Sequence, residues 1–485
     1  MTEKSKEFRA NKKIIFKVLN RKRNLEHSPN NNKFKKKAKN LFILEKPRNI
    51  INTENQNLNE INDNNPKLLE KNKLTKQINI QQNENIAPNP PIKNIKMEFG
   101  DYICYNNYTI GNGSFGEVLY GKQKSTHKEV AIKILKEDMS KESIKKEMIY
   151  TEKLKGNPGF PTLYYTGMHD KNNIIVESLL GPSLDKLFKF CQKKFPLKTV
   201  CLIGIEMVKR LETMHNLGLL HRDLKPNNLT WGNYNSSYNK TIPQYFNNND
   251  KLDINTIYLI DFGLSCYYWD NIYTRKHYKI QTECSFVGTL RYASLNSHNG
   301  IKQSRRDDLE SMLYILIYYL KGQLPWQEVK AKKKEERYKI IREKKSEISV
   351  DILCEDIPTE FAELLKYVKS LEFEDSPSYT QFYKTFYNLI NRLNFEQCQE
   401  KNYNYIWEKK LVDGLENYEK NNDDKLIKEA EELFKGYPIN LKEYINYIIT
   451  NNKLLNEFNK KRESFHSGDT TEFSESIKSI NLIPK

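Results

Sequence analysis

Four short segments in a fixed order constrain the fold of this 485-residue chain more than any other feature. A glycine-rich turn at residues 111–116 is followed by a strand-like Val-Ala-Ile-Lys segment at residues 130–133. A loop that reads His-Arg-Asp-Leu-Lys-Pro-Asn-Asn comes next at residues 221–228, and Asp-Phe-Gly follows at residues 261–263. One such segment could arise by chance, but four in this order and at workable distances make chance a poor explanation.

The segments carry the residue types that phosphoryl transfer from ATP requires, and their order resembles the signature of a protein kinase. Glycines in the turn let the backbone close over phosphates without Cβ clashes. Lys133 is expected to hold the α- and β-phosphates, and Glu147 in the following helix is expected to pair with it. The expected nucleotide-binding residues are Ile110, Gly111, Asn112, Gly113, Ser114, Phe115, Gly116, Val118, Ala131, Lys133, Leu179 and Leu180.

The second pair of segments supplies the expected catalytic oxygens. Asp223 can accept the proton of a substrate hydroxyl, and Lys225 can reach the transferred phosphate and is typical of serine/threonine kinases. Asn228 and Asp261 are the expected oxygen ligands of Mg²⁺. His221 is expected to support the loop rather than to take a proton. The resemblance thus implies ATP and Mg²⁺, with proteins that carry Ser or Thr sites as substrates.

Residues after the Asp-Phe-Gly segment narrow the resemblance. Most kinases have Ala-Pro-Glu at the end of the activation segment, but residues 288–296 read Gly-Thr-Leu-Arg-Tyr-Ala-Ser-Leu-Asn, and Gln-Ser-Arg-Arg-Asp-Asp-Leu-Glu-Ser follows at 303–311. This resembles the casein kinase one family, as do the stretches at 179–184, 194–200 and 324–327. The resemblance runs from about Tyr102 to about Trp407. It implies the α+β, two-lobed kinase fold, with a small β-rich lobe containing one helix and a larger helical lobe.

The family prefers acidic sites or sites primed by a phosphate three residues before the target, which implies an anion pocket near the activation segment. On matching positions that pocket maps to Arg291 and Ser294 with Lys334 and Arg337, and Arg side chains form strong charge-assisted hydrogen bonds with phosphate. The alternative is that the Lys-rich run 332–337 is only a solvated helix face.

Three departures from the family pattern bear on this expectation. Glu177 stands before the hinge, where the family usually has Met, and Glu328 stands where it tends to have Gly beside the anion pocket. The like charge of Glu328 would weaken binding of a primed residue. An insertion at about residues 232–254 has no counterpart in the family.

Composition divides the remainder of the chain. Hydrophobic residues make up 38% of the whole chain, below the roughly 45–50% usual for globular domains. Residues 1–96 are rich in Asn, Lys, Gln and Glu and lack Trp, Tyr and Cys, which predicts a disordered basic tail. The predicted kinase domain covers 97–410, a helical extension covers 411–462, and a flexible Ser/Thr-rich tail covers 463–485.

The helical extension is expected to contain two short amphipathic helices, one around Leu426 to Phe434 and one that opens at Asn440 with Glu443 at its third position. They dock on the kinase core or bind a partner. In the last tail, Ser464, Ser467 and Thr470 are spaced by three, so each phosphate would prime the next, which suggests autophosphorylation.

Charge and cysteine usage bear on partners and compartment. Residues 1–50 hold 16 Lys or Arg against 4 Asp or Glu, so this segment supplies +12 of the formal net charge of +17. Its clusters at 22–23 and 35–37 resemble a nuclear import signal, or they form a solvated tail, and such an arm could contact nucleic acid weakly. The seven scattered cysteines lack any C-x-x-C pair, which favours a reducing compartment.

The longest apolar run is far short of the roughly 20 residues that cross a bilayer. We therefore expect a protein of the cytoplasm, the nucleus or both, without a membrane span and with a monomeric kinase core. Two further functions remain open at this point. A pseudokinase scaffold would keep the fold without the reaction, and a chromatin- or RNA-associated adaptor would depend on the basic arm.

Overall fold

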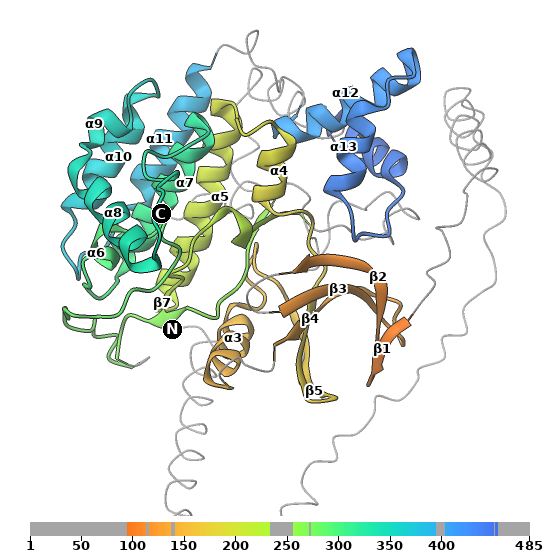
Figure 1. Cartoon of the computed structure of the whole chain (residues 1–485), viewed down its shortest axis with the longest axis horizontal. Coiled ribbons are helices and arrows are strands. Elements are labelled where there is room, and N and C mark those ends of the chain that lie inside the picture. The colour runs from red at the N-terminus through yellow and green to blue at the C-terminus, as the bar shows by residue number, and fades with distance from the viewer. Residues whose placement is uncertain are drawn as a thin grey trace, which may run out of the picture. The chain divides into compact units, whose positions relative to one another are not determined.

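The computed structural model describes residues 95–112, 116–136, 141–232, 256–270, 273–393, 403–450 and 452–453. They form a small β-rich lobe and a larger helical lobe (Figure 1). The expected α+β, two-lobed fold is therefore confirmed. The basic tail, the insertion, the Ser/Thr-rich tail and three residues of the glycine turn lie outside the described residues.

A six-stranded antiparallel sheet forms the small lobe, with the strand order β1-β2-β3-β4-β6-β5. The pairing of β3 with β4 runs without a register shift, whereas β2 shifts its register on both sides of Thr109. The strands are β1 (Ile95–Phe99), β2 (Tyr102–Asn112), β3 (Gly116–Gln123), β4 (Glu129–Leu135), β5 (Leu163–His169) and β6 (Asn172–Ser178).

Strand alternation gives this sheet two different faces, because successive side chains point to opposite sides. One face carries a fully apolar core that includes Leu119, Ile132 and Val176. Lys133 is paired with Val118 on one side and with Ile175 on the other, so these three side chains share the opposite face. The sheet therefore separates its own core from the face on which Lys133 lies.

One helix, α3 (Lys141–Leu154), completes the small lobe. Glu142 lies in its first turn and pairs with Lys146 at 2.9 Å. The turn at Gly156 ends the helix region, where the backbone adopts a φ of +81°. Ile144, on the buried side of α3, packs in a small cluster with Leu135 and Ile175 of the sheet. This contact fixes the position of Glu147 relative to β4.

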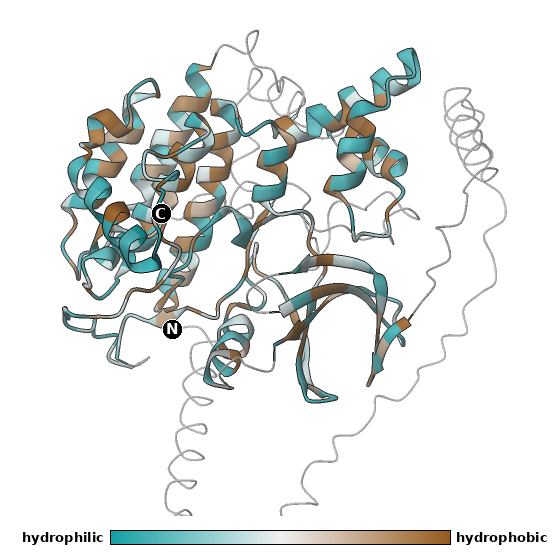
Figure 2. Ribbon diagram, in the orientation of Figure 1, coloured by the Kyte–Doolittle hydropathy of each residue, from teal (hydrophilic) through white to brown (hydrophobic). Residues whose placement is uncertain are grey.

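The helical lobe is built around α7 (Arg305–Lys321), in which every side chain from Asp307 to Tyr319 is buried. A helix that is buried on all sides lies inside its domain. Figure 2 shows hydrophobic residues on the facing sides of the surrounding helices. These helices are α4 (Leu184–Phe190), α5 (Leu197–Asn216), α6 (Leu295–His298), α8 (Lys334–Glu347), α9 (Val350–Leu353), α10 (Thr359–Ser370) and α11 (Tyr379–Arg392).

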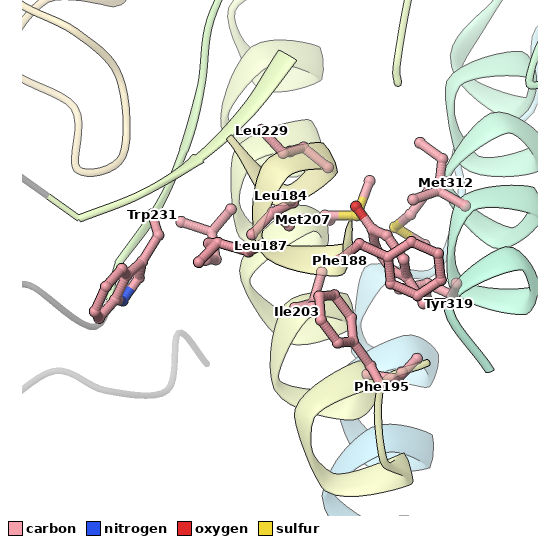
Figure 3. Close-up of a cluster of buried hydrophobic side chains, with 14 of the residues drawn as sticks. Leu184, Leu187, Phe188, Phe195, Ile203, Met207, Leu229, Trp231, Met312 and Tyr319 are labelled. Atoms are coloured by element: carbon pink, nitrogen blue, oxygen red, sulfur yellow. The ribbon is translucent and has the colours of Figure 1, made fainter. Parts of the chain in front are cut away.

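Large apolar side chains fill the space between α4, α5 and α7. Figure 3 shows Phe188 of α4, Met207 of α5 and Tyr319 of α7 in this cluster, and all three are buried. The rings of Phe188 and Tyr319 lie 5.1 Å apart. Close-packed aromatic rings of this kind contribute large buried areas. The cluster supports the short elements that carry the catalytic loop, β7 (Leu219–Leu220), η1 (Pro226–Asn228), β8 (Leu229–Trp231), β9 (Ile257–Leu259) and β10 (Cys266–Tyr267).

Between residues 403 and 450, the structure describes three helices. The expected helix around Leu426 to Phe434 is α13 (Lys425–Leu433), and residues 441–450 form the helix that opens at Asn440. The backbone N–H of Glu443 donates to Asn440 Oδ1 at 3.3 Å, which caps the helix, and Asn440 Nδ2 donates to Glu443 Oε1 at 3.0 Å. The sequence reading missed a third helix, α12 (Ile406–Asn421), which runs across residue 410. No helix among the described residues has the length and apolar character that a membrane crossing requires.

Trp407 tests how firmly α12 is attached to the helical lobe. Its fully buried ring lies 5.3 Å from the ring of Phe195 and 5.8 Å from that of Trp231. We expect Trp407→Ala to lower the free energy of unfolding by about 3–5 kcal/mol, because it leaves a cavity. Urea unfolding followed by circular dichroism measures this loss. Tyr418→Ala, at an exposed position of the same helix, is the control and should change stability by less than about 0.5 kcal/mol. Equal losses in the two variants would contradict the packing described.

Candidate active site

A buried ion pair joins α3 to the face of the sheet on which Lys133 lies. Lys133 Nζ on β4 donates to Glu147 Oε1 on α3 at 2.5 Å, and both side chains are largely buried. Burial alone would lower the pKa of Lys133, but the carboxylates of Glu147, Asp261 and Glu177 raise it above its ordinary value. The amine therefore stays charged at neutral pH, as a group that neutralises phosphate must.

Glu177 is a third carboxylate beside this pair. On β6 it stands opposite Ala131 of β4, and Ile175, two residues earlier, stands opposite Lys133. Side chains two residues apart on a strand point to the same face of the sheet. Glu177 therefore lies on the same face as Ile175 and Lys133. Burial raises the pKa of Glu177 to about 7, and Glu147 and Asp261 add to the shift while Lys133 opposes it. The carboxyl is thus close to half protonated at neutral pH.

Most of the expected nucleotide-binding residues lie on β2, β3 and β4 or directly after β6. In the turn, Gly111 of β2 stands opposite Val118 of β3. Gly116 begins β3 with a φ of +150°, and a Cβ there would lie 2.0 Å from Ile134 O, so only glycine fits. The structure describes Ile110, Gly111, Asn112, Gly116, Val118, Ala131, Leu179 and Leu180, whereas Gly113, Ser114 and Phe115 lie outside the described residues.

The catalytic loop is held by one carboxylate from α7. Asp308 accepts hydrogen bonds from the backbone N–H groups of His221 and Arg222, both at 2.8 Å, and from His215 Nε2 at 3.1 Å. His221 accepts from the backbone N–H of Asp223 through Nδ1 at 3.2 Å and donates through Nε2 to Ile260 O at 3.1 Å. Both ring nitrogens of His221 therefore support the loop, in line with its expected role.

Two side chains orient the carboxylate of Asp223. Lys225 Nζ donates to Asp223 Oδ2 at 2.5 Å, and Thr289 Oγ1 donates to Oδ1 at 2.6 Å. Thr289 belongs to the segment that begins at Gly288, where a Cβ would lie 2.7 Å from Arg222 O. The segment after the Asp-Phe-Gly motif therefore lies directly against the catalytic loop.

The two expected metal ligands are also positioned by the loop. Asn228 Nδ2 donates to Asp223 O at 3.0 Å, which leaves its Oδ1 as a potential ligand. Asp261 has a φ of +68°, and the next residue, Phe262, is buried with its ring 5.7 Å from that of His221. The buried Glu147 Oε2 has no hydrogen-bond partner among the described residues. An amide oxygen beside a carboxylate is a donor set that fits Mg²⁺.

The expected anion pocket is only partly assembled. Arg291 Nη1 donates to the Tyr292 hydroxyl at 3.3 Å, and its guanidinium lies 5.8 Å from the centre of the Tyr318 ring. Ser294 is buried as the N-cap of α6 and donates its only hydroxyl hydrogen to Asp307 Oδ1 at 2.7 Å. This hydrogen bond occupies the Ser294 hydroxyl within the helical lobe, and the part of Ser294 in the anion pocket stays a prediction. Lys334 and Arg337 are exposed in the first turn of α8, and Glu328 is exposed as well.

Two buried side chains tie the Arg291 segment to α8 and its preceding loop. Trp326 Nε1 donates to Arg291 O at 2.8 Å. Lys345 Nζ donates to Leu290 O at 3.1 Å and to Ala293 O at 2.5 Å, and burial lowers its pKa to about 7. Lys345 belongs to α8, so the helix that carries Arg337 is attached to the segment that carries Arg291.

Sequence reasoning did not assign four of these positioning residues. Thr289 and Trp326 stand inside the stretches that resemble casein kinase one, and Asp308 stands in the Arg-Arg-Asp-Asp run. The motifs therefore marked these three residues, but they did not show which groups each residue would contact. Lys345 gave no signal of its own, because it lies in a Lys- and Arg-rich helix.

Comparison with known families agrees with this geometry. A family model described as "Protein kinase domain" matches residues 105–403, which is more than half of the chain. The chain belongs to the protein kinase family. This kinase accordingly acts as an ATP-dependent phosphotransferase with protein substrates, and its Lys133, Glu147, Asp223, Asn228 and Asp261 lie within the matched region.

The pH dependence of stability tests the environment of Glu177. The folded carboxyl keeps its proton up to about pH 7, whereas its ordinary pKa is 4.5. Between these values the folded kinase binds more protons than the unfolded chain, so rising pH lowers stability through this group. Glu177→Gln removes that dependence. We expect the melting temperature of the variant, relative to the wild type, to be higher at about pH 8.5 than at about pH 5.5.

Differential scanning fluorimetry at both pH values measures this difference. Glu152→Gln, at an exposed position of α3, is the control, and its difference from the wild type should be the same at both. A Glu177→Gln variant that behaves like the control would show that the carboxyl is not held in a charge-unfavourable site.

Proposed function

We propose that this protein is a serine/threonine kinase of casein kinase one type, which transfers the γ-phosphate of ATP to Ser or Thr hydroxyls. One observation carries this proposal. The structure contains both the Lys133–Glu147 ion pair and an Asp223 carboxylate whose two oxygens accept hydrogen bonds from Lys225 and Thr289. The arrangement provides charge neutralisation on the nucleotide side and a proton acceptor on the peptide side. Positioning and electrostatics of this kind supply most of the catalysis in phosphoryl transfer.

In the proposed reaction, the Ser or Thr oxygen bonds to the γ-phosphorus as the bond from that phosphorus to the β–γ bridging oxygen breaks. Asp223 takes the hydroxyl proton, and ADP leaves with the bridging oxygen. Lys225 bonds to Asp223 Oδ2 at 2.5 Å and so lies where it can also balance charge on the transferred phosphate. Lys133 holds the nucleotide, and Glu147 keeps its amine in place.

Asn228 and Asp261 are the residues that would hold Mg²⁺. When bound, the ion neutralises negative charge on the phosphate oxygens. The hydrogen bond from Asn228 Nδ2 to Asp223 O couples the metal side of the loop to the proton acceptor. ATP and Mg²⁺ are therefore the proposed co-substrate and cofactor.

Specificity for acidic or phosphate-primed sites is the finer part of the proposal. Arg291, Lys334 and Arg337 supply the positive charge of the proposed anion pocket, and Ser294 stands beside Arg291 with its hydroxyl directed to Asp307. The tie of Lys345 to Ala293 O supports this grouping, because it holds α8 against the Arg291 segment. Glu328 is exposed, so its charge is screened by water and salt and opposes a primed residue only weakly.

The proposed localisation is the cytoplasm, the nucleus or both, with a monomeric core and weak nucleic-acid contact through the basic tail. A pseudokinase scaffold and a nucleic-acid-associated adaptor are the alternatives. The complete set Lys133, Glu147, Asp223, Asn228 and Asp261 disfavours the scaffold. If the protein were a nucleic-acid-associated adaptor, deletion of residues 1–96 would abolish its association with chromatin or RNA.

Asp223→Asn tests the proposed proton acceptor. Asparagine has nearly the same shape but cannot take the proton, so we expect the rate of phosphate transfer to fall roughly 10²- to 10⁴-fold. The measurement uses labelled ATP, Mg²⁺ and a Ser peptide. Asp351→Asn, in exposed α9, is the matched control and should retain full activity. If Asp223→Asn transfers phosphate as fast as the wild type, Asp223 is not the proton acceptor. If the wild type itself transfers no phosphate, the pseudokinase scaffold is favoured.

Arg291→Ala tests the proposed anion site. Two peptides that differ only in a phosphoserine three residues before the target Ser are compared. Loss of charge-assisted hydrogen bonds should reduce the preference for the primed peptide by roughly 10- to 100-fold in kcat/KM. Use of the unprimed peptide should change little. Arg392→Ala, at an exposed position on α11, is the control, and an equal preference in both variants would discard the site.

A further inference from the structure

The match to the protein kinase model ends at residue 403, and the described residues after it return to the nucleotide-binding lobe. We propose that residues 403–450, here named the strap, position β2 and thereby set the affinity for ATP. This inference rests on the proposed function, because it concerns the same nucleotide site. Figure 1 shows the strap in blue, with the loop after α13 above β2.

The first end of the strap is anchored to the helical lobe. Lys198 Nζ donates to Tyr403 O at 2.6 Å, and the backbone N–H of Ile406 donates to Thr199 Oγ1 at 3.0 Å. Both partners lie in the first turn of α5. Lys410 Nζ donates to Phe190 O at the end of α4. Together with the buried ring of Trp407, these bonds fasten α12 to a rigid part of the lobe.

The strap is itself stiff. Gly414 of α12 lies so close to α13 that a Cβ on it would be 2.9 Å from Leu426 Cβ. Lys410 also pairs with Glu429 of α13 at 2.9 Å. Beyond α13, the Tyr444 ring lies 5.1 Å from that of Phe434 and 6.1 Å from that of Trp231. A movement of α12 would therefore carry α13 and residues 441–450 with it.

The loop after α13 touches the backbone of the nucleotide lobe. A Cβ on Gly436 would lie 2.1 Å from Thr109 O and 3.0 Å from the backbone nitrogen of Ile110. Gly436 also has a φ of +92°, a backbone conformation that residues with a side chain rarely adopt. The contact falls at the register shifts of β2 around Thr109. The strap thus meets β2 directly before the glycine turn.

A lysine from the helical lobe reaches the same point of β2. Lys186 Nζ of α4 donates to Ile110 O at 3.0 Å. Burial lowers the pKa of Lys186, and the Glu432 carboxylate of α13 opposes this shift. α4 and the loop after α13 therefore both contact β2 at Thr109 and Ile110, and Ile110 is one of the proposed nucleotide-binding residues.

This arrangement has a consequence for nucleotide binding. Ile110 and Gly111 of β2 belong to the proposed nucleotide site, so this part of β2 must be ordered when ATP binds. A strand that is already held loses less conformational entropy on binding. Release of β2 from the strap would then weaken ATP binding and leave the peptide site, on the other lobe, unaffected.

Gly436→Ala in the full-length chain is the test, and Gly156→Ala is its matched control. Both glycines have a similar φ, +92° and +81°, but a Cβ on Gly156 meets nothing within 4 Å. Equilibrium titration with Mg·ATP should show a roughly tenfold higher Kd for Gly436→Ala and no change for Gly156→Ala. KM for ATP should rise with Kd, while KM for the peptide stays constant. The melting temperature should fall in both variants, and further in Gly436→Ala, which adds the clash with β2 to the strain of the positive φ.

Lys186→Met is a second variant that adds no backbone strain, with Lys189→Met, exposed on the same helix, as its control. The Kd for ATP should rise in the first alone. An unchanged Kd in both Gly436→Ala and Lys186→Met, or parallel rises in the KM for ATP and for peptide, overturns the proposal. Because binding needs no transfer, a wild type that binds ATP without phosphorylating refutes only the proposed function. A wild type that binds no ATP refutes both.

Discussion

The Asp308 carboxylate is the interaction on which the geometry of the catalytic loop depends. It receives the backbone N–H groups of His221 and Arg222 and the ring of His215. Arg222 has a φ of +69°, a conformation that costs energy in a residue with a side chain. Burial would raise the pKa of Asp308, but these hydrogen bonds and the nearby imidazoles lower it below its ordinary value. A charged acceptor therefore offsets the strain of the loop.

The same end of α7 also holds the peptide side of the cleft. Asp307, one residue earlier, accepts from the Ser294 hydroxyl at 2.7 Å. Glu310, less than one turn later, accepts from the backbone N–H of Leu295 at 2.9 Å. Three acidic side chains on one buried helix thus fix both the proton acceptor and the segment beside it. The buried Leu, Ile and Met side chains further along α7 pack inside the lobe and hold this end of the helix in place.

Sequence reasoning succeeded where the chemistry is carried by local motifs. Order and spacing were enough to pair Lys133 with Glu147, because a strand lysine and a helix carboxylate 14 residues later form a local unit. Contacts between distant segments were out of reach. Thr289 bonds to Asp223 across 66 residues of sequence, and no spacing rule connects them. For the strap, the sequence predicted two of the helices and gave docking on the kinase core as one alternative, but helical periodicity does not predict α12's partners or the surface that a helix meets.

Two lysines show why a charged residue in the sequence does not reveal which group its side chain contacts. Lys345 lies in a run of exposed cations, yet its amine is buried and donates to Leu290 O and Ala293 O on the peptide side. Lys186 donates to Ile110 O on the nucleotide side. In each case an amine from a helix of the large lobe holds a backbone carbonyl of a substrate-binding segment. A carbonyl can be held by a donor whatever side chain its residue carries, so such a tie leaves no pattern in the sequence. Both proposed substrate sites therefore contact helices of the large lobe through interactions that only the structure reveals.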